Sequence, residues 1–375
     1  MPSRRDFLTT TGVLALSTRL SRAQRAKPNI VILLASGLPQ AALDPSAPVP
    51  NLTRLASESV QFERTYVSCP ETGPSQAALI TGRFPFACGV LRDGMLLPPD
   101  QPSIAQKLKD AGYQTGIFGD WRIGGPTGSP ETDVALEWIK QNRNNPFFLL
   151  VAWPRADPTV VDDNAGRILG VIDNLPLKNN TIVVFTSDHG YGSEPLEPAV
   201  RIPWMLRYPQ LKPGRRTGIL ASNVDLAPTL LALCGVSAGD SMQGRDLLRD
   251  QPQSIYCVGQ IGTPDAWRMV VRGLDKLVVD PSQNITHLYN LGEDPTEMDN
   301  LARDPAQELK RNELKALLND WMRRSGDGMD PSGLKRRAQV ERRTFAQSRD
   351  SAEPTDHRFP GQYGRESPTD RMPKE

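Results

Sequence analysis

The sequence predicts an α/β protein in which helices cover both faces of a central sheet. Three observations support this prediction. Continuous apolar runs, rich in leucine and β-branched residues, are typical of strands buried on both faces. They lie at 29–35, 146–153 and 181–186. Segments with apolar residues at helical spacing, such as 131–141 and 162–175, alternate with these runs. The length of 375 residues, with 38% hydrophobic residues, suffices for one large domain and a smaller appended one.

The composition excludes several classes of function. A formal net charge of +1 gives no electrostatic reason to expect nucleic acid or an anionic membrane as partner. The four cysteines are far apart and have no CxxC spacing, which argues against a zinc ribbon or a thioredoxin-like motif. One disulfide is the alternative to free buried thiols, which we favour. The three histidines are too few for a histidine-rich two-zinc site. His287 lies in a predicted strand, where we expect a structural role, and His357 lies in a polar tail.

The N-terminus has the pattern of an export signal. Arg4 and Arg5 precede a weakly apolar run at 9–17, and more arginines follow it. This run is far too short to span a membrane, so residues 1–24 are predicted to be a twin-arginine signal peptide. The predicted location is therefore periplasmic or extracellular. A disordered basic leader is the alternative.

The stretch at 66–85 is the centre of the predicted site, because a loop with prolines and glycines runs there into a short apolar helix. Pro74 and Ser75 are suited to the first turn of that helix, where serine can cap free amides. Thr72 is then presented near a helix N-terminus, a place that favours an anion such as a phosphate or sulfate ester.

This stretch resembles the signature of the type I sulfatases of the alkaline phosphatase superfamily, a Cys or Ser followed by x-P-S-R, apolar residues and T-G-R. Residues 74–75 and 79–83 match it. Thr72 stands where the family has the Cys or Ser that becomes formylglycine, and Gln76 stands where it has the arginine that holds this group. The resemblance therefore implies that the scaffold is retained and that the catalytic pair is replaced.

Two strand ends bear on the calcium that the family uses. After the first apolar run the resemblance implies an Asp-Asp pair of ligands, but this chain has Ser36 and Gly37. After the run at 181–186, the family's S-D-H/N-G is intact and includes Asp188 and His189. One interpretation is that Asp188 and His189 form a residual metal or anion site. The other, which we favour, is that their side chains only hold the turn from the strand into the following loop. With half of the acidic ligands lost, no cofactor is predicted.

The end of the apolar segment 114–119 carries two further replacements. Residues 119–124 resemble the family's G-K-W-H-L-G, whose lysine and histidine contact the sulfate group; Asp120 and Arg122 stand at those positions. A carboxylate in place of a cation is expected to oppose sulfate binding. The active-site histidine expected near 154–158 and the lysine expected in 191–200 are also absent.

The resemblance extends from residue 28 to 327 and implies an alkaline-phosphatase-like, mixed and mostly parallel sheet flanked by helices, with a small C-terminal α+β subdomain. Its other matching segments are helices at 51–60 and 224–236 and strands at 201–209, 268–280 and 284–291. The sequence pattern also predicts helices at 103–112 and 305–324. We predict a sulfatase-like domain at 28–236, an antiparallel-sheet subdomain at 237–325 and a disordered tail at 326–375.

The predicted function is that of an exported sulfatase-family protein, a pseudo-sulfatase that is catalytically inactive or strongly impaired and binds a sulfated or other glycan. No integral membrane segment and no nucleic-acid partner are predicted. The alternative is an active hydrolase or transferase of sulfuric or phosphoric esters that uses Thr72 as its nucleophile, as other members of the superfamily use threonine.

Overall fold

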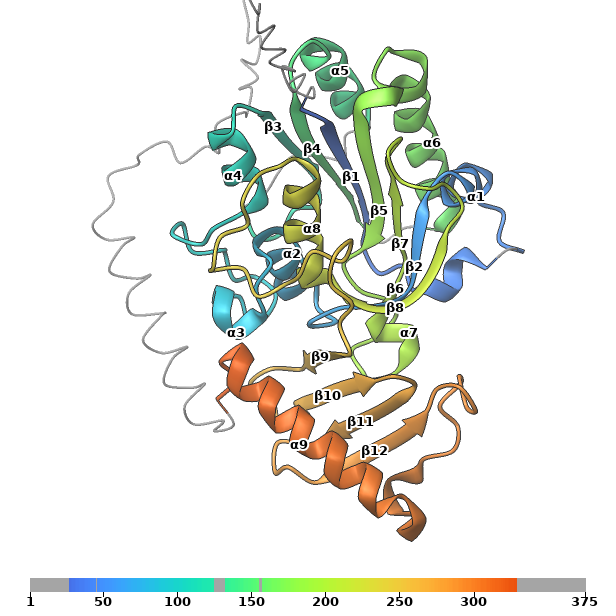
Figure 1. The fold of residues 1–375 in the computed structure, drawn as a ribbon, viewed down its shortest axis with the longest axis vertical. Helices are drawn as coiled ribbons and strands as arrows, with labels where there is room; N and C mark the ends of the chain where they lie inside the picture. The colour runs from blue at the N-terminus through green and yellow to red at the C-terminus, as the bar shows by residue number, and fades with distance from the viewer. Residues whose placement is uncertain (1–26, 45, 125–131, 155–156, 329–375) are drawn as a thin grey trace, which may run out of the picture.

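The computed structural model describes residues 27–44, 46–124, 132–154 and 157–328. These residues form two sheets, a large one with helices on both faces and a small antiparallel one beside it (Figure 1). The predicted signal segment at 1–24 and the tail beyond residue 328 lie outside the described residues. Within the described part of the chain, none of the helices combines the length and the apolarity that a membrane crossing requires.

The large sheet is mixed and mostly parallel, as predicted. Its order is β3-β4-β1-β5-β7-β2-β6, and β8 pairs with β2. The pairs β3–β4, β4–β1, β1–β5 and β2–β8 are parallel, whereas the pairs of β7 and β6 are antiparallel. The strands are β1 Asn29–Ala35, β2 Val60–Tyr66, β3 Gln114–Gly119, β4 Phe147–Trp153, β5 Thr181–Ser187, β6 Arg201–Ile202, β7 Trp204–Arg207 and β8 Arg216–Ser222.

Alternate residues of β1 pack into two separate cores, as expected for a strand buried on both faces. Ile30, Ile32 and Leu34 pack with α2, α4 and α8, whereas Val31 and Leu33 pack with α1, α5 and α6. The helices of the first face are α2 Thr72–Thr81, α4 Ile104–Asp110 and α8 Leu226–Leu233. Those of the second face are α1 Pro50–Ser57, α5 Thr132–Asn142 and α6 Pro158–Asn174.

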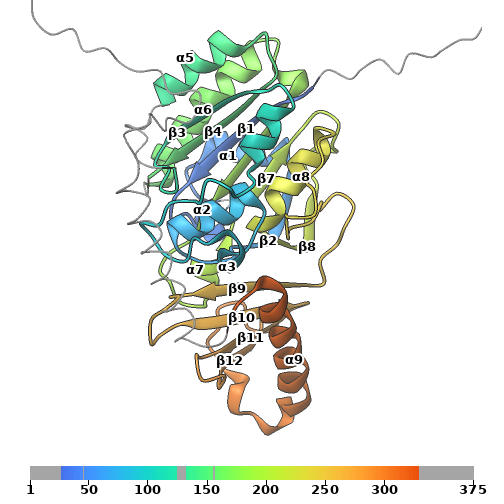
Figure 2. The ribbon, with the colours of Figure 1, turned by 90° about the vertical axis from the view of Figure 1, so that its left-hand side faces the viewer.

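The small sheet has the order β12-β11-β10-β9 and is antiparallel throughout. Figure 2 shows it below the large sheet, with α9 packed across it. Leu314, Leu318 and Met322 of α9 belong to the core on this face of the sheet, together with Phe84 from the larger part. The elements are β9 Ser254–Gly259, β10 Trp267–Arg272, β11 Asp275–Val279, β12 Ile285–Asn290 and α9 Glu308–Ser325. The remaining helices, α3 Pro85–Cys88 and α7 Glu197–Val200, are single turns.

Several predicted element limits are wrong. The first helix was expected at 51–60, but α1 ends at Ser57 because β2 begins at Val60. The helix expected at 162–175 begins four residues earlier, with Pro158 in its first turn and Asp157 as its N-cap. The strand expected at 201–209 is divided between β6 and β7, and Pro203, which has no N–H for the ladder, lies between them. All four cysteines are free, as expected.

Candidate functional site

The candidate site lies where β1 and β5 end beside the N-terminus of α2. Ala35 and Ser187 are register partners, so the residues that follow them leave the sheet side by side. The N–H of Gly37 donates a hydrogen bond of 3.1 Å to Asp188 Oδ1. Gly37 has φ of 67°, a conformation that suits glycine. The sheet thus brings the predicted pairs 36–37 and 188–189 together.

Asp188 is a fully buried carboxylate. Its Oδ1 accepts hydrogen bonds from the backbone N–H groups of Gly37 and His189, at 3.1 and 2.7 Å. Its Oδ2 is buried and has no hydrogen-bond partner among the described residues. Burial raises the pKa of Asp188, although the His189 charge, the amides of Gly37 and His189 and the Ser36 side chain oppose that rise.

The start of α2 differs from the sequence-based prediction. The helix begins at Thr72, two residues before Pro74, and its N-cap is Glu71, which makes no side-chain capping bond. Ser75 is therefore not the cap. The N–H of Gly73, in the first turn, donates to Asp93 Oδ1 at 2.6 Å. An amide at the anion-favouring end of the helix thus already binds a carboxylate of the protein itself.

Glu71 adds a further acid beside Thr72. Burial raises the pKa of Glu71, and the charge of Asp93 raises it further. Glu71, Asp93 and Asp188 are thus three acids at one end of α2, where the resemblance implies a sulfate group. This arrangement disfavours an anionic substrate at Thr72.

Thr72 and His189 are in hydrogen-bond contact, with 3.2 Å between Thr72 Oγ1 and His189 Nε2. His189 Nδ1 lies 2.8 Å from the carbonyl oxygen of Gly190. Because a carbonyl can only accept, Nδ1 carries a proton and Nε2 of the neutral ring is the acceptor for the Thr72 hydroxyl. The pair has the geometry of a hydroxyl and its general base.

Gln76 ties α2 to the end of β3. Its Nε2 donates to the carbonyl oxygen of Asp120 at 3.0 Å, and its Oε1 accepts from the N–H of Arg122 at 2.8 Å. The residue is 1% exposed, so its amide fills the place that the resemblance assigns to an arginine.

Asp120 and Arg122 form a bidentate ion pair. Arg122 Nε donates to Asp120 Oδ1, and Arg122 Nη2 donates to Asp120 Oδ2 at 2.9 Å. The hydrogen bonds and the charge of Asp120 raise the pKa of Arg122. Since the pair has no net charge, neither residue presents an isolated charge to the site.

Two buried polar residues support the site: Ser75, which the sequence suggested as a helix cap, and Asn223, which was not identified from the sequence. Ser75 Oγ donates to the carbonyl oxygen of Asp188 and accepts from Asn223 Nδ2 at 2.8 Å. Asn223 Oδ1 accepts from the N–H of Ser68 at 2.9 Å, which fixes its amide. No local pattern distinguishes Asn223, because its partners are 148 and 155 residues away along the chain. His287, by contrast, lies on β12 in the small sheet, apart from this site.

Comparison with known proteins identifies the family. A family model described as Sulfatase matches residues 28–126 and 159–236. Human arylsulfatase A is 36% identical over 354 residues, which cover 63% of this chain and 69% of that protein. This chain belongs to the sulfatase family. The ulvan-active sulfatase of Formosa agariphila is 24% identical over 419 residues and covers 80% of this chain. That alignment spans 82% of the relative.

Solved structures of other sulfatase-fold proteins support the architecture. The structure of BT4656 with its substrate D-glucosamine-2-N,6-O-disulfate superimposes with a TM-score of 0.73 and 19% identity. It covers 81% of this chain and 99% of that one. At this level of identity the likeness concerns the fold alone, which agrees with the predicted alkaline-phosphatase-like sheet.

The residues present do not fit the calcium that the family resemblance implies. Calcium takes six to eight oxygen ligands, several of them carboxylates. The site provides one suitably placed carboxylate, Asp188, and two backbone amides already occupy its Oδ1. In the ranges that the structure describes, no group of three or more His, Cys, Asp or Glu side chains could hold a metal ion. Asp188 Oδ2, which has no hydrogen-bond partner among the described residues, offers a metal one oxygen ligand. Ser36 and Gly37 add no negative charge to it.

Proposed function

We propose that this sulfatase-family protein is a pseudo-sulfatase, without formylglycine-dependent activity, that binds a sulfated or other glycan. The observation that carries the proposal is the absence of a carboxylate at residues 36 and 37, the strand end beside Asp188. A sulfatase needs its carboxylates to hold the metal that stabilises the reacting group, and the end of β1 supplies only Ser36 and Gly37 next to buried Asp188.

The surroundings of Thr72 support the same proposal. Gln76 is bound to the backbone at 120 and 122, so its amide is not available to steady a reacting group. Asp93 holds the amide of Gly73 that an anionic ester would otherwise contact. Each lost electrostatic contact to the reacting group costs on the order of 3 kcal/mol in the transition state.

A glycan ligand is supported by the relatives. The Formosa agariphila protein is named for its action on ulvan, and the structure of BT4656 contains a sulfated glucosamine. We extend only the class of ligand, a sulfated or other glycan, to this chain.

Turnover assays test the proposal directly. The purified full-length protein is assayed with an aryl sulfate and an aryl phosphate, with and without added calcium, and intact-mass spectrometry examines position 72. We expect background turnover and an unmodified threonine. Turnover of the aryl sulfate well above background, or a formylglycine at 72, would refute the proposal. Glycan arrays with sulfated and unsulfated saccharides then test binding.

A second candidate function is favoured by the contact between Thr72 and His189. A hydroxyl with a general base at 3.2 Å could attack a sulfuric or phosphoric ester directly. The acids around Thr72 and the occupied amide of Gly73 oppose this function. One result distinguishes the two candidate functions. If the native protein with an unmodified threonine hydrolyses an aryl sulfate or phosphate, and Thr72→Val abolishes this turnover, the second function is established.

We further propose that residues 1–24 direct export by the twin-arginine route and that the chain divides into 28–236 and 237–325. Replacing Arg4 and Arg5 with lysine is expected to leave the precursor in the cytoplasm, since the pattern at 3–8 is the feature that the route recognises. Unchanged export would count against it. Periplasmic or extracellular location follows from the same proposal.

A further inference from the structure

A hollow opens between the large part of the molecule and α9, at the opposite end of α2 from Thr72. It has a volume of about 200 Å³ and is lined by Phe84, Gln243, Arg245, Trp321 and Arg324. Thr72 begins α2, and Phe84 follows its C-terminus. The ten-residue helix therefore separates the hollow from the site around Thr72 by about 15 Å. A narrower inner part continues from the hollow to Ser222, Asp225 and Ser254.

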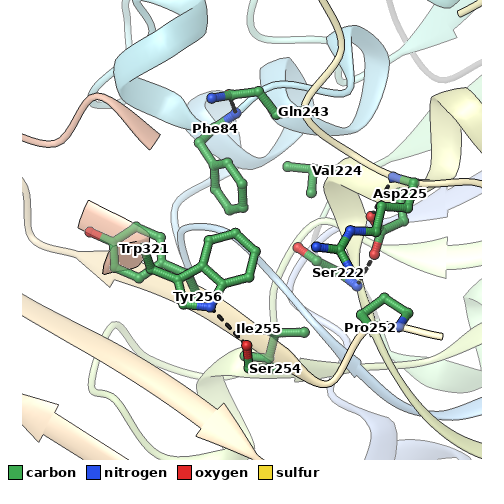
Figure 3. A pocket seen from close by; sticks show the side chains of 11 residues that line it. Phe84, Ser222, Val224, Asp225, Gln243, Pro252, Ser254, Ile255, Tyr256 and Trp321 are labelled. Carbon is green, nitrogen blue, oxygen red and sulfur yellow. Dashed lines mark hydrogen bonds between the residues drawn. The ribbon is translucent and has the colours of Figure 1, made fainter. Parts of the chain in front are cut away.

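The inner part, which shares Phe84 and Trp321 with the hollow, has walls held by contacts between side chains. Figure 3 shows Phe84, Tyr256 and Trp321 on one side of this inner part and Ser222, Asp225 and Pro252 on the other. The Trp321 ring is stacked on Tyr256 with 6.2 Å between centroids, and its Nε1 donates to Ser254 Oγ at 2.9 Å. The hollow is therefore preformed, which lowers the entropic cost of binding a ligand.

Two arginines from different parts of the chain border this hollow. Arg324 lies over the ring of Trp321, with its guanidinium carbon 4.2 Å from the centroid, and its Nε pairs with Asp320 at 2.8 Å. Its side chain is 46% exposed, so the guanidinium group reaches solvent. Arg245 is half-buried, and its guanidinium has no hydrogen bond or ion pair to any residue of the described ranges. Two guanidinium groups thus keep donors for an external acceptor.

The acids near the hollow offset only part of this charge. Asp320 also pairs with Arg323, at 3.2 Å, so it serves two arginines. Asp225 is buried and uses both oxygens on backbone amides: Oδ2 accepts from Ser222 N–H and Oδ1 from Arg245 N–H, each at 2.8 Å. Burial raises the pKa of Asp225 to about 6, while those bonds and the Arg245 charge oppose the rise.

We propose that the hollow is an accessory oxyanion site, in which Arg245 and Arg324 bind a sulfate ester or carboxylate group of an acidic saccharide. The planar guanidinium group matches both kinds of oxyanion in bidentate geometry. The site is separate from Thr72, whose surroundings are acidic, and it does not depend on catalysis there.

Calorimetric titration of the full-length protein at low ionic strength tests this site, since salt screens exposed charges. The probes are a sulfated disaccharide, the same disaccharide without sulfate but with a uronate, and a neutral disaccharide. Arg245→Gln and Arg324→Gln are each expected to weaken binding at least tenfold. Arg167→Gln is the control, because Arg167 is an exposed arginine on α6 that is not among the lining residues, and it is expected to change binding less than twofold.

The outcomes separate the alternatives. If only the sulfated probe binds, and both arginine variants lose that binding, the site recognises sulfate esters. If the uronate probe binds as tightly as the sulfated probe, the site also recognises carboxylates. Binding that both variants retain overturns the accessory site. Arg122→Gln tests the other location. If this substitution abolishes binding, the saccharide binds at the site around Thr72 and the accessory-site proposal is wrong. Thermal unfolding and circular dichroism of each variant verify that the fold is intact.

Discussion

The Thr72 hydroxyl lies 3.2 Å from Nε2 of His189, and the opposite nitrogen of the same ring lies 2.8 Å from the carbonyl oxygen of Gly190. The carbonyl fixes the tautomer, and the tautomer decides that Nε2 accepts from Thr72. Family resemblance places this histidine at a metal-binding position, but the contacts show it bound to a side chain and to the backbone. The arrangement of this ring can be measured directly.

We predict that neutral His189 carries its proton on Nδ1. Long-range ¹⁵N–¹H spectra at about pH 8 measure this, and a chain with three histidines makes assignment simple. Thr72→Val is the control, because the bond to Gly190 remains and the tautomer should not change. A proton on Nε2 in the native protein would contradict the prediction and would remove the base from the second candidate function.

Gln76→Ala is predicted to destabilise the fold by about 2 kcal/mol, since it leaves the Asp120 carbonyl and the Arg122 N–H without their partner in a buried place. Urea unfolding measures the change. Gln141→Ala is the control: Gln141 is exposed on α5, so we expect a change within about 0.5 kcal/mol. Equal effects of the two substitutions would show that Gln76 has no structural role.

Lys276→Met is predicted to cost about 3–5 kcal/mol, because it leaves buried Glu297 without its cation and leaves Glu197 only Arg201, at 3.5 Å. Lys276 is fully buried, with Nζ 2.6 Å from Glu297 Oε1 and 3.2 Å from Glu197 Oε1. Lys310→Met is the control, since Lys310 pairs with Asp275 at 2.8 Å on a partly exposed surface, where such pairs contribute at most about 1 kcal/mol.

The loss in Lys276→Met should also depend on pH. Burial raises the pKa of Glu297 even though Lys276 opposes the rise, and removal of Lys276 raises it further. A pKa raised in the folded state means that folding favours the protonated acid, so the variant gains stability as pH falls through that pKa. The difference in unfolding free energy between native protein and variant should therefore shrink between about pH 8 and pH 5. A constant difference across this range would show that the removal of Lys276 does not raise the pKa of Glu297.

Sequence patterns predicted the parts of the fold that are dictated locally. The apolar runs of β1, β4 and β5 are continuous because both faces of these strands are buried, and their positions were predicted to within a residue or two. Strands β2, β8 and β9 were missed. In β2, buried residues alternate irregularly with half-buried polar ones, and β8 begins with exposed residues, so neither has such a run.

The site shows the same division between local and long-range information. Residues 36–37 and 188–189 were found because they follow predicted strands whose ends meet at one edge of the sheet. Asp93 and Asn223 were not found, because their contacts with α2 join residues 20 and 148 positions apart. Ser75 was taken for a helix cap, since its sequence position suits one, whereas folding buries it against the backbone of Asp188.

We predict last that restoring the nucleophile alone restores no activity. Thr72→Cys, expressed with a formylglycine-generating enzyme, supplies a convertible residue. Gln76 still binds the backbone at 120 and 122, and Asp93 still occupies the Gly73 amide. Asp188 still has Ser36 and Gly37, and no carboxylate, at the neighbouring strand end. Aryl sulfate turnover by this variant should therefore equal that of the native protein.

The smallest set that we expect to restore activity replaces the missing parts together, because catalytic groups that act as a unit have effects only when the others are present. This set is Ser36→Asp, Gly37→Asp, Thr72→Cys, Gln76→Arg, Asp120→Lys and Arg122→His. Aspartate tolerates the left-handed backbone of Gly37, with φ of 67°, better than most residues. Each restored contact is worth on the order of 3 kcal/mol in the transition state, so turnover should rise steeply only as the set is completed. If Thr72→Cys alone hydrolysed an aryl sulfate well above background, the unaltered site would be competent and the pseudo-sulfatase proposal would be wrong.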